Sequence, residues 1–132
     1  MKRAPVPFRL GPVEGDYWRL ELDMGGNPMS YDFRAEAGDE EQITAMCAFQ
    51  GSHAESTFVQ NLLVHQRRPD AFLVLRGKVL NRFDQSRVSN RELGSAQELV
   101  TILREVFDLD VPAAAGLWDA ICERHEALFS QI

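Results

Sequence analysis

Two short apolar segments joined by a tight turn in the middle of the chain constrain its fold most. Residues Ala71–Leu75 and Val79–Phe83 are rich in strand-forming residue types, and Arg76-Gly77-Lys78 alone separates them. Parallel neighbouring strands need a long crossover, so strands with so short a connection must pair antiparallel. The sequence therefore predicts a hairpin here, and Arg67-Arg68-Pro69-Asp70 predicts another turn before it.

Further strands are predicted on both sides of this hairpin. The segment Thr57–Gln66 is rich in strand formers and predicts the strand that enters the sheet, and Arg87–Leu93 predicts the fourth strand. Nearer the N-terminus, apolar and polar residues alternate, as in Tyr17–Leu22. This pattern predicts two or more antiparallel strands between Val6 and Glu36, interrupted by the turn signal Gly25-Gly26-Asn27-Pro28.

Helical patterns occupy the middle and the end of the chain. Between Gly38 and Gly51 the apolar residues fall at helical spacing after the acidic turn Asp39-Glu40-Glu41, which suits a helix N-terminus. Ser95-Ala96-Gln97-Glu98 forms a capping box that starts another helix, and Asp108–Pro112 ends it. Residues Leu117–Phe129 predict a final amphipathic helix.

These elements predict the α+β class, with an antiparallel sheet or partial barrel, a short helix in the middle and two C-terminal helices packed on the sheet. A chain of 132 residues with 45% hydrophobic residues is long enough for one core, so residues 1–132 are expected to form a single compact unit.

Composition excludes several functional classes. The net charge of −6 is opposite in sign to that of a general nucleic-acid binder. Cys47 and Cys122 lie in no metal-spaced cluster, so we expect neither a metal site nor a disulfide framework. The opening MKRAPVPFRLG lacks the apolar core of a signal peptide, and no apolar run reaches the length of a membrane span. We therefore expect a cytoplasmic protein with no membrane partner.

A series of segments carries a resemblance that extends over nearly the whole chain. They are Pro7–Leu10, Tyr31-Asp32-Phe33, Ser52–Leu62, Arg68-Pro69-Asp70, Leu75-Arg76-Gly77, Arg91-Glu92-Leu93 and Ser95–Pro112. In this order they resemble the C-terminal half of arylamine N-acetyltransferases. The resemblance implies that residues 1–56 correspond to part of the family's β-rich second domain, and residues 57–132 to its α/β lid.

The resemblance implies a reaction that this sequence cannot complete alone. The family transfers an acetyl group from acetyl-CoA to an arylamine or hydrazine through an acetyl-cysteine, using a Cys-His-Asp triad. Its RGGYCFE-like and DVGFG-like motifs do not occur in this sequence. We expect no catalytic residue here, and hence a truncated or split part that is inactive alone. The alternative is a non-catalytic module that binds CoA or another protein.

The remaining cysteines offer no convincing substitute for the triad. Cys47 falls on the apolar face of a predicted helix, and Cys122 and His125 lie three residues apart among apolar neighbours. Free cysteine often behaves as a small buried hydrophobic residue, so we expect packing roles for both thiols.

The resemblance also implies CoA contacts near the start of the lid region. A Ser/Thr-Phe step in the family matches Thr57 and Phe58, which implies a hydrogen-bonding hydroxyl and an apolar contact for the pantetheine or adenine portion. Ser56 is a further candidate. The alternative for Phe58 is an ordinary core residue on a strand face. Glu55 departs from the family pattern, because an acid would repel the pyrophosphate.

Basic residues are concentrated in the predicted sheet. Between Thr57 and Arg91 the sequence holds seven basic residues and two acidic ones, an asymmetry that attracts anions. We expect Lys78 and Arg82 to bind the phosphates of CoA. The alternative is that these side chains face water without a ligand.

A partial barrel would expose unpaired strand edges and an apolar face. We therefore expect a partner, either a separate N-terminal catalytic half or another copy of this chain.

Overall fold

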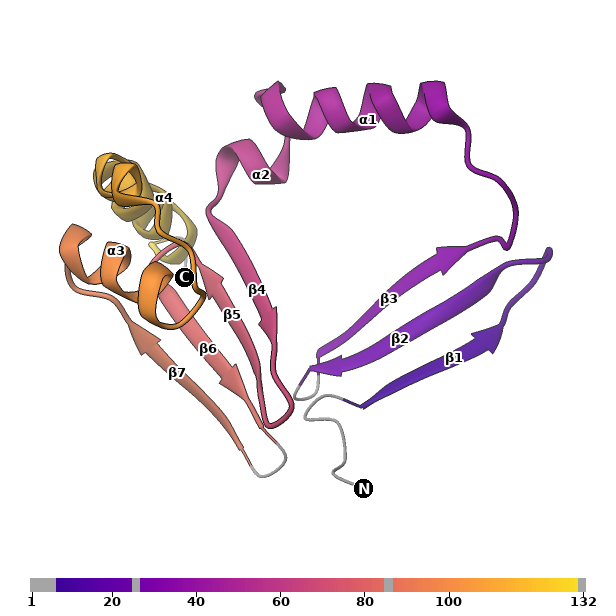
Figure 1. The fold of residues 1–132 in the computed structure, drawn as a ribbon, viewed down its shortest axis with the longest axis horizontal. Helices are drawn as coiled ribbons and strands as arrows, with labels where there is room; N and C mark the ends of the chain where they lie inside the picture. Colours follow the sequence, from indigo (N-terminus) through magenta and orange to yellow (C-terminus); the bar gives the residue numbers. More distant parts are fainter. Residues whose placement is uncertain (1–6, 25–26, 85–86, 131–132) are drawn as a thin grey trace.

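The computed structural model describes residues 7–24, 27–84 and 87–130, and it has two antiparallel sheets (Figure 1). The α+β class is confirmed. The elements follow the order β1 (Phe8–Pro12), β2 (Trp18–Met24), β3 (Asn27–Phe33), α1 (Glu40–Ser52), α2 (Thr57–Gln60), β4 (Leu63–Arg67), β5 (Phe72–Arg76), β6 (Val79–Phe83), β7 (Val88–Glu92), α3 (Ala96–Glu105), the 3₁₀ helix η1 (Pro112–Leu117) and α4 (Trp118–Phe129).

The first sheet has the order β1-β2-β3, and ion pairs join its neighbouring strands. Arg19 lies opposite Asp32 in the register, and its Nε is 2.7 Å from the Asp32 carboxylate. Arg9 pairs with Glu21 in the same way. The predicted N-terminal strands are confirmed, whereas Val6 and the Gly25-Gly26 part of the turn lie outside the described residues.

Helix α1 confirms the short helix predicted in the middle of the chain. The Asp39 side chain accepts hydrogen bonds from the backbone N–H groups of Glu41 and Gln42, which satisfies two free donors of the first turn. None of the helix side chains is buried. Indeed, every buried residue that the structure describes lies at Ser56 or beyond. Among the residues whose burial the structure describes, none from the first sheet or α1 therefore belongs to the buried core.

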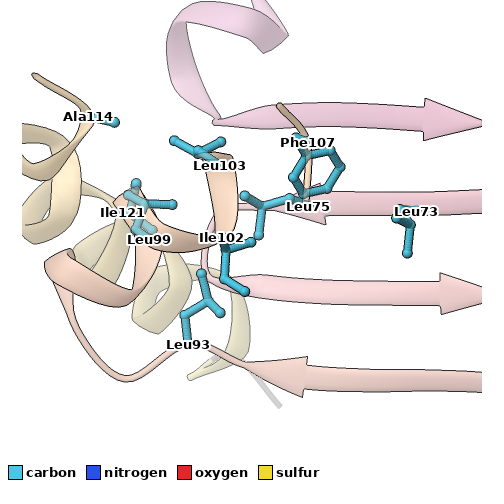
Figure 2. Close-up of a cluster of buried hydrophobic side chains, with 9 residues drawn as sticks. All are labelled: Leu73, Leu75, Leu93, Leu99, Ile102, Leu103, Phe107, Ala114 and Ile121. Carbon is cyan, nitrogen blue, oxygen red and sulfur yellow. The ribbon is translucent and has the colours of Figure 1, made fainter. Parts of the chain in front are cut away.

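The second sheet carries the core on one face. Its order is β4-β5-β6-β7, as expected for successive hairpins. Leu73 and Leu75 of β5 belong to one buried cluster with Leu99, Ile102 and Leu103 of α3. Figure 2 shows Leu75 near these helix residues and Leu73 further along the strand. Leu93, Phe107, Ala114 and Ile121 complete this cluster, so both C-terminal helices contribute to it.

Helix α3 starts at the predicted cap. The Ser95 hydroxyl accepts a hydrogen bond from the Glu98 backbone N–H at 3.1 Å, and the Glu98 carboxylate accepts one from the Gly94 N–H at 2.8 Å. The carboxylate thus reaches one residue further back than in the standard capping box. After the helix, Asp108 adopts a left-handed conformation with φ of 57°, and Pro112 begins η1.

The strand predicted over Thr57–Gln66 is wrong in its first half. Residues Thr57–Gln60 form the one-turn helix α2, and the strand β4 starts at Leu63. The Ser56 hydroxyl caps this turn by accepting from the Phe58 N–H, and the Asn61 side chain donates to the Thr57 carbonyl. These local hydrogen bonds outweigh the strand propensity of the intervening residues.

Two leucines near the core should differ in how much stability they contribute. Leu99 is fully buried on α3, whereas Leu109 is 41% exposed beyond the end of that helix. We expect Leu99→Ala to lower the free energy of unfolding by about 2–5 kcal/mol, because it leaves a cavity. The matched change Leu109→Ala should cost about 0.5 kcal/mol or less. Urea titration followed by circular dichroism measures both, and equal losses would contradict this assignment of the core.

Candidate functional site

A groove of about 710 Å³ lies where α2, the β5–β6 turn and α4 meet. Apolar side chains from all three parts line it, among them Val59, Leu62, Val79, Ile121, Leu128 and Phe129. Arg76, Arg124 and His125 add basic groups to the same lining. The groove therefore combines an apolar interior with basic nitrogen atoms.

Gly77 lies in the β5–β6 turn, which borders the groove. It has a φ of +58° in the β5–β6 turn, a conformation that favours glycine. Its N–H donates a hydrogen bond to the Leu62 carbonyl at 2.8 Å, which ties the turn to the segment between α2 and β4. A Cβ atom at this position would lie 3.7 Å from Ile121 of α4. The β5–β6 turn therefore lies between Leu62 on one side and Ile121 of α4 on the other.

The three residues predicted around the start of the lid region have different environments. Ser56 is 2% exposed, and its hydroxyl donates to the Gln50 carbonyl at 2.7 Å while it caps α2. Thr57 is exposed at the first position of α2. Phe58 is 59% exposed and lines the groove, so its alternative interpretation as a core residue on a strand face is wrong. Their contacts with CoA stay predictions.

Lys78 is already paired within the protein. Its Nζ lies 2.7 Å from Oε1 of Glu92, and the side chain is largely buried. The hydrogen bond from Lys78 lowers the pKa of the Glu92 carboxyl, and the same bond raises the pKa of Lys78. Nε2 of His125 lies 3.8 Å from the same carboxylate oxygen. A phosphate at Lys78 would have to compete with Glu92.

Arg82 lies near the other end of β6. It is four positions along the chain from Lys78, which corresponds to about 13 Å in an extended strand. Its guanidinium is 3.3 Å from Asp70 and 3.8 Å from Asp84. The structure therefore places Lys78 within the turn that borders the groove and Arg82 at a distance from it, and both cations have acidic partners.

Sequence reasoning missed Arg76 and Arg124 as site residues. Nε of Arg124 donates to Oδ1 of Asn61 at 3.3 Å, and the Asn61 amide in turn donates to the Thr57 carbonyl at 2.9 Å. This chain of bonds links α4 to α2. The sequence does indicate Arg124: Ile121, Arg124 and Leu128 are spaced so that they share one side of a helix, which places the arginine beside apolar residues.

The two cysteines have different surroundings. Cys47 is exposed, so its predicted packing role is wrong, and no residue of α1 is buried. Cys122 is half-buried on α4. Within the described ranges, no group of His, Cys, Asp and Glu side chains is placed to hold a metal ion. The described helices also include none that is long and apolar enough to span a membrane.

Ser56→Ala should reveal the structural role of its hydroxyl. The change removes the cap of α2 and leaves the Gln50 carbonyl without this donor, so we expect a loss of about 1–3 kcal/mol in the free energy of unfolding. The matched change Ser52→Ala removes an exposed hydroxyl that donates to the Ala48 carbonyl within α1, and it should have little effect. Equal denaturant midpoints for the two variants would contradict this role.

Glu92→Gln should make stability less dependent on pH. Because the folded pKa of Glu92 lies below its ordinary value of 4.5, the pair with Lys78 stabilises the fold above that pH and loses its effect as pH falls through the lower folded pKa. We expect the variant to melt at a lower temperature than the wild type at pH 7 and by a smaller margin at pH 3, where more of the wild-type carboxyl is protonated. The control Glu105→Gln alters an exposed pair at 4.0 Å. A deficit of equal size at both pH values would contradict the prediction.

Comparison with known proteins shows which family and which solved structures this chain resembles. A model of the N-acetyltransferase family matches residues 2–115, and no curated protein sequence matches the chain. Among solved structures, the arylamine N-acetyltransferase of Mycobacterium marinum in complex with CoA superposes with a TM-score of 0.73 at 22% identity. That superposition covers 93% of this chain and 45% of the other.

Other solved structures agree. The arylamine N-acetyltransferase from M. tuberculosis gives a TM-score of 0.73 at 21% identity, with 90% of this chain and 45% of the other covered. The enzyme from Salmonella typhimurium gives 0.68 at 20% identity, with 88% and 45% covered. The chain thus spans less than half the length of these structures. Since the family model matches most of its residues, the chain belongs to the N-acetyltransferase family, that of the arylamine N-acetyltransferases.

Proposed function

We propose that this chain forms the C-terminal part of an acetyltransferase that moves an acetyl group from acetyl-CoA to an arylamine or hydrazine in the cytoplasm, and that it is inactive alone. Family membership supports the reaction class. The absence of an RGGYCFE-like motif from the sequence supports the need for a second part, because the family's chemistry begins at that cysteine.

The observation that carries this proposal is the uncovered apolar surface of the first half of the chain. Large hydrophobic side chains on the first sheet and α1 are exposed, including Phe8, Leu10, Tyr31, Phe33, Ile43 and Met46. Contiguous apolar surface of this kind marks an interface in soluble proteins. We propose that the catalytic part of the family fold covers it, whether it belongs to a longer form of this chain or to a separate polypeptide.

This chain would bind acetyl-CoA, whereas the other part would supply the catalytic residues. The Thr57 hydroxyl and the Phe58 ring stand exposed on α2, where they are accessible to the pantetheine portion of CoA. Lys78 and Arg82 would bind phosphate by exchanging their carboxylate partners for it. The other part would supply the thiolate that accepts the acetyl group, the imidazole and the aspartate.

Reconstitution tests the need for a second part. The 132-residue chain, incubated with acetyl-CoA, should leave Cys47 and Cys122 unacetylated by mass spectrometry and should acetylate no arylamine. Addition of a polypeptide with the family's Cys-His-Asp half should restore acetylation. The control is the same polypeptide with its cysteine changed to alanine. Activity of the chain alone would refute the proposal, and stable CoA binding without restored activity would favour the non-catalytic module.

Phe58→Ala tests the proposed CoA contact. Removal of the ring should raise the Kd for CoA by about tenfold, as expected for the loss of an apolar anchor. Val88→Ala is a suitable control, because Val88 is also an exposed apolar residue but lies on β7. Isothermal titration calorimetry on the reconstituted protein measures both. An unchanged Kd for Phe58→Ala would remove this residue from the site.

A further inference from the structure

We propose that Arg124 is a positioning residue for CoA binding: through Asn61 it holds α2 in the orientation that presents Phe58 to the coenzyme. The inference rests on the proposed function, because it takes α2 as a CoA contact. Arg124 lies on α4, 63 residues from Asn61 in sequence, and its Nε donates to Oδ1 of that asparagine at 3.3 Å. This bond joins the two helices that line the groove.

Helix α2 is too short to hold its own orientation. It has four residues, Thr57–Gln60, and none of them is buried. A single helical turn is not stable by itself in water, and most helices in proteins are held by packing of an apolar face. Since no side chain of α2 is buried in the core, its orientation depends on hydrogen bonds at its two ends.

The N-terminal end of α2 is bonded to α1 and the residues that follow it. The Ser56 hydroxyl donates to the Gln50 carbonyl at 2.7 Å, and the Gln60 side-chain amide donates to the Ala54 carbonyl at 3.0 Å. No residue of α1 is buried, so these bonds attach α2 to a segment outside the core. They do not fix α2 relative to the second sheet.

The C-terminal end of α2 is bonded to the core through Asn61. The backbone N–H and the side-chain amide of Asn61 both donate to the Thr57 carbonyl, at 3.0 and 2.9 Å. The side-chain oxygen of Asn61 accepts from Arg124. Arg124 lies about one helical turn after Ile121, which is 7% exposed and belongs to the hydrophobic core. The bond therefore attaches α2 to an element that the core holds in place.

The orientation of α2 decides where the Phe58 ring lies. Phe58 is 59% exposed and lines the groove together with Asn61 and Arg124. The hydrogen bond from Gly77 to the Leu62 carbonyl fixes the backbone after α2 and not the helical turn itself. Loss of the Arg124 bond should therefore let α2 tilt and move the ring away from the position in which it contacts CoA.

A double-mutant cycle tests the pair. Arg124→Met keeps an aliphatic side chain and removes the donors, whereas Asn61→Ala removes the acceptor. Each should raise the Kd for CoA about threefold to tenfold, and the double variant should bind no more weakly than the weaker single variant. Calorimetry on the reconstituted protein measures all three. Losses that multiply would show that Arg124 contacts CoA itself, and the positioning role would be overturned.

Two matched substitutions are controls for this cycle. Arg104→Met changes an exposed arginine of α3, and Asn90→Ala changes an exposed asparagine of β7. Both should leave the Kd for CoA unchanged. Losses equal to those of Arg124→Met and Asn61→Ala would overturn the assignment.

The Phe58→Ala background tests whether Arg124 acts through the ring. With the ring absent, Arg124→Met should change the Kd for CoA by less than about twofold, because nothing is left to position. A loss as large as in the wild-type background would overturn the inference.

Steady-state kinetics separate positioning from loss of folded protein. In the reconstituted enzyme, Arg124→Met should raise the KM for acetyl-CoA by the same factor as the Kd. It should leave kcat within about twofold, because the catalytic residues lie in the other part. A lower kcat at an unchanged KM would indicate a smaller folded fraction and would overturn the positioning role.

Amide hydrogen exchange tests the attachment of α2 in the chain itself, without a ligand. The N–H groups of Gln60 and Asn61 donate to carbonyls at the start of α2. Arg124→Met should speed their exchange roughly threefold or more, and the Leu99 N–H of α3 should exchange at its wild-type rate. Unchanged exchange at Gln60 and Asn61 would overturn the inference.

The outcomes distinguish this inference from the proposed function. If the reconstituted wild-type protein binds no CoA, both are refuted. If it binds CoA and Arg124→Met leaves the Kd unchanged, only the positioning role is refuted, and the proposed function stands.

Discussion

The packing of α3 on β5 is the interaction on which the rest of the structure depends. Leu99, Ile102 and Leu103 contact the face of the sheet that carries Leu73 and Leu75, and α4 adds Ile121 to the same cluster (Figure 2). Burial of these side chains supplies the main driving force for folding in a domain of this size. It also fixes α4 against the β5–β6 turn, where Ile121 lies beside Gly77, and this contact shapes the groove.

The described residues of the first half of the chain form no comparable core. Its strands are paired, and ion pairs such as Arg19–Asp32 join them, but exposed ion pairs contribute little to stability. Figure 1 shows the first sheet and the second sheet diverging, with α1 connecting them at the open end. In the described residues, Arg67 lies over the Phe8 ring at 5.5 Å and links the two sheets. This uneven burial is the physical basis for proposing a second part.

Pairing across strands also decides which cations can bind a ligand. A cluster of basic residues in sequence suggests a single anion site, yet the antiparallel register places Val79 opposite Glu92 and brings that acid to Lys78. Arg82 likewise lies near Asp70, which is twelve residues away in sequence. The sequence does not indicate that Arg76 and Arg124 line the same groove, because they belong to different elements that meet only when α4 packs on the sheet.

The sequence by itself determined the α+β class, the hairpins of the second sheet, the capped start of α3 and the family. These features rest on local patterns: alternation, turn residues, and side chains that cap the adjacent backbone. The tertiary structure decided that Thr57–Gln60 forms a helical turn, that Cys47 is exposed, and that Lys78 and Arg82 are paired. Burial and ion pairing depend on which distant residues meet, and residue spacing along the chain does not specify those contacts.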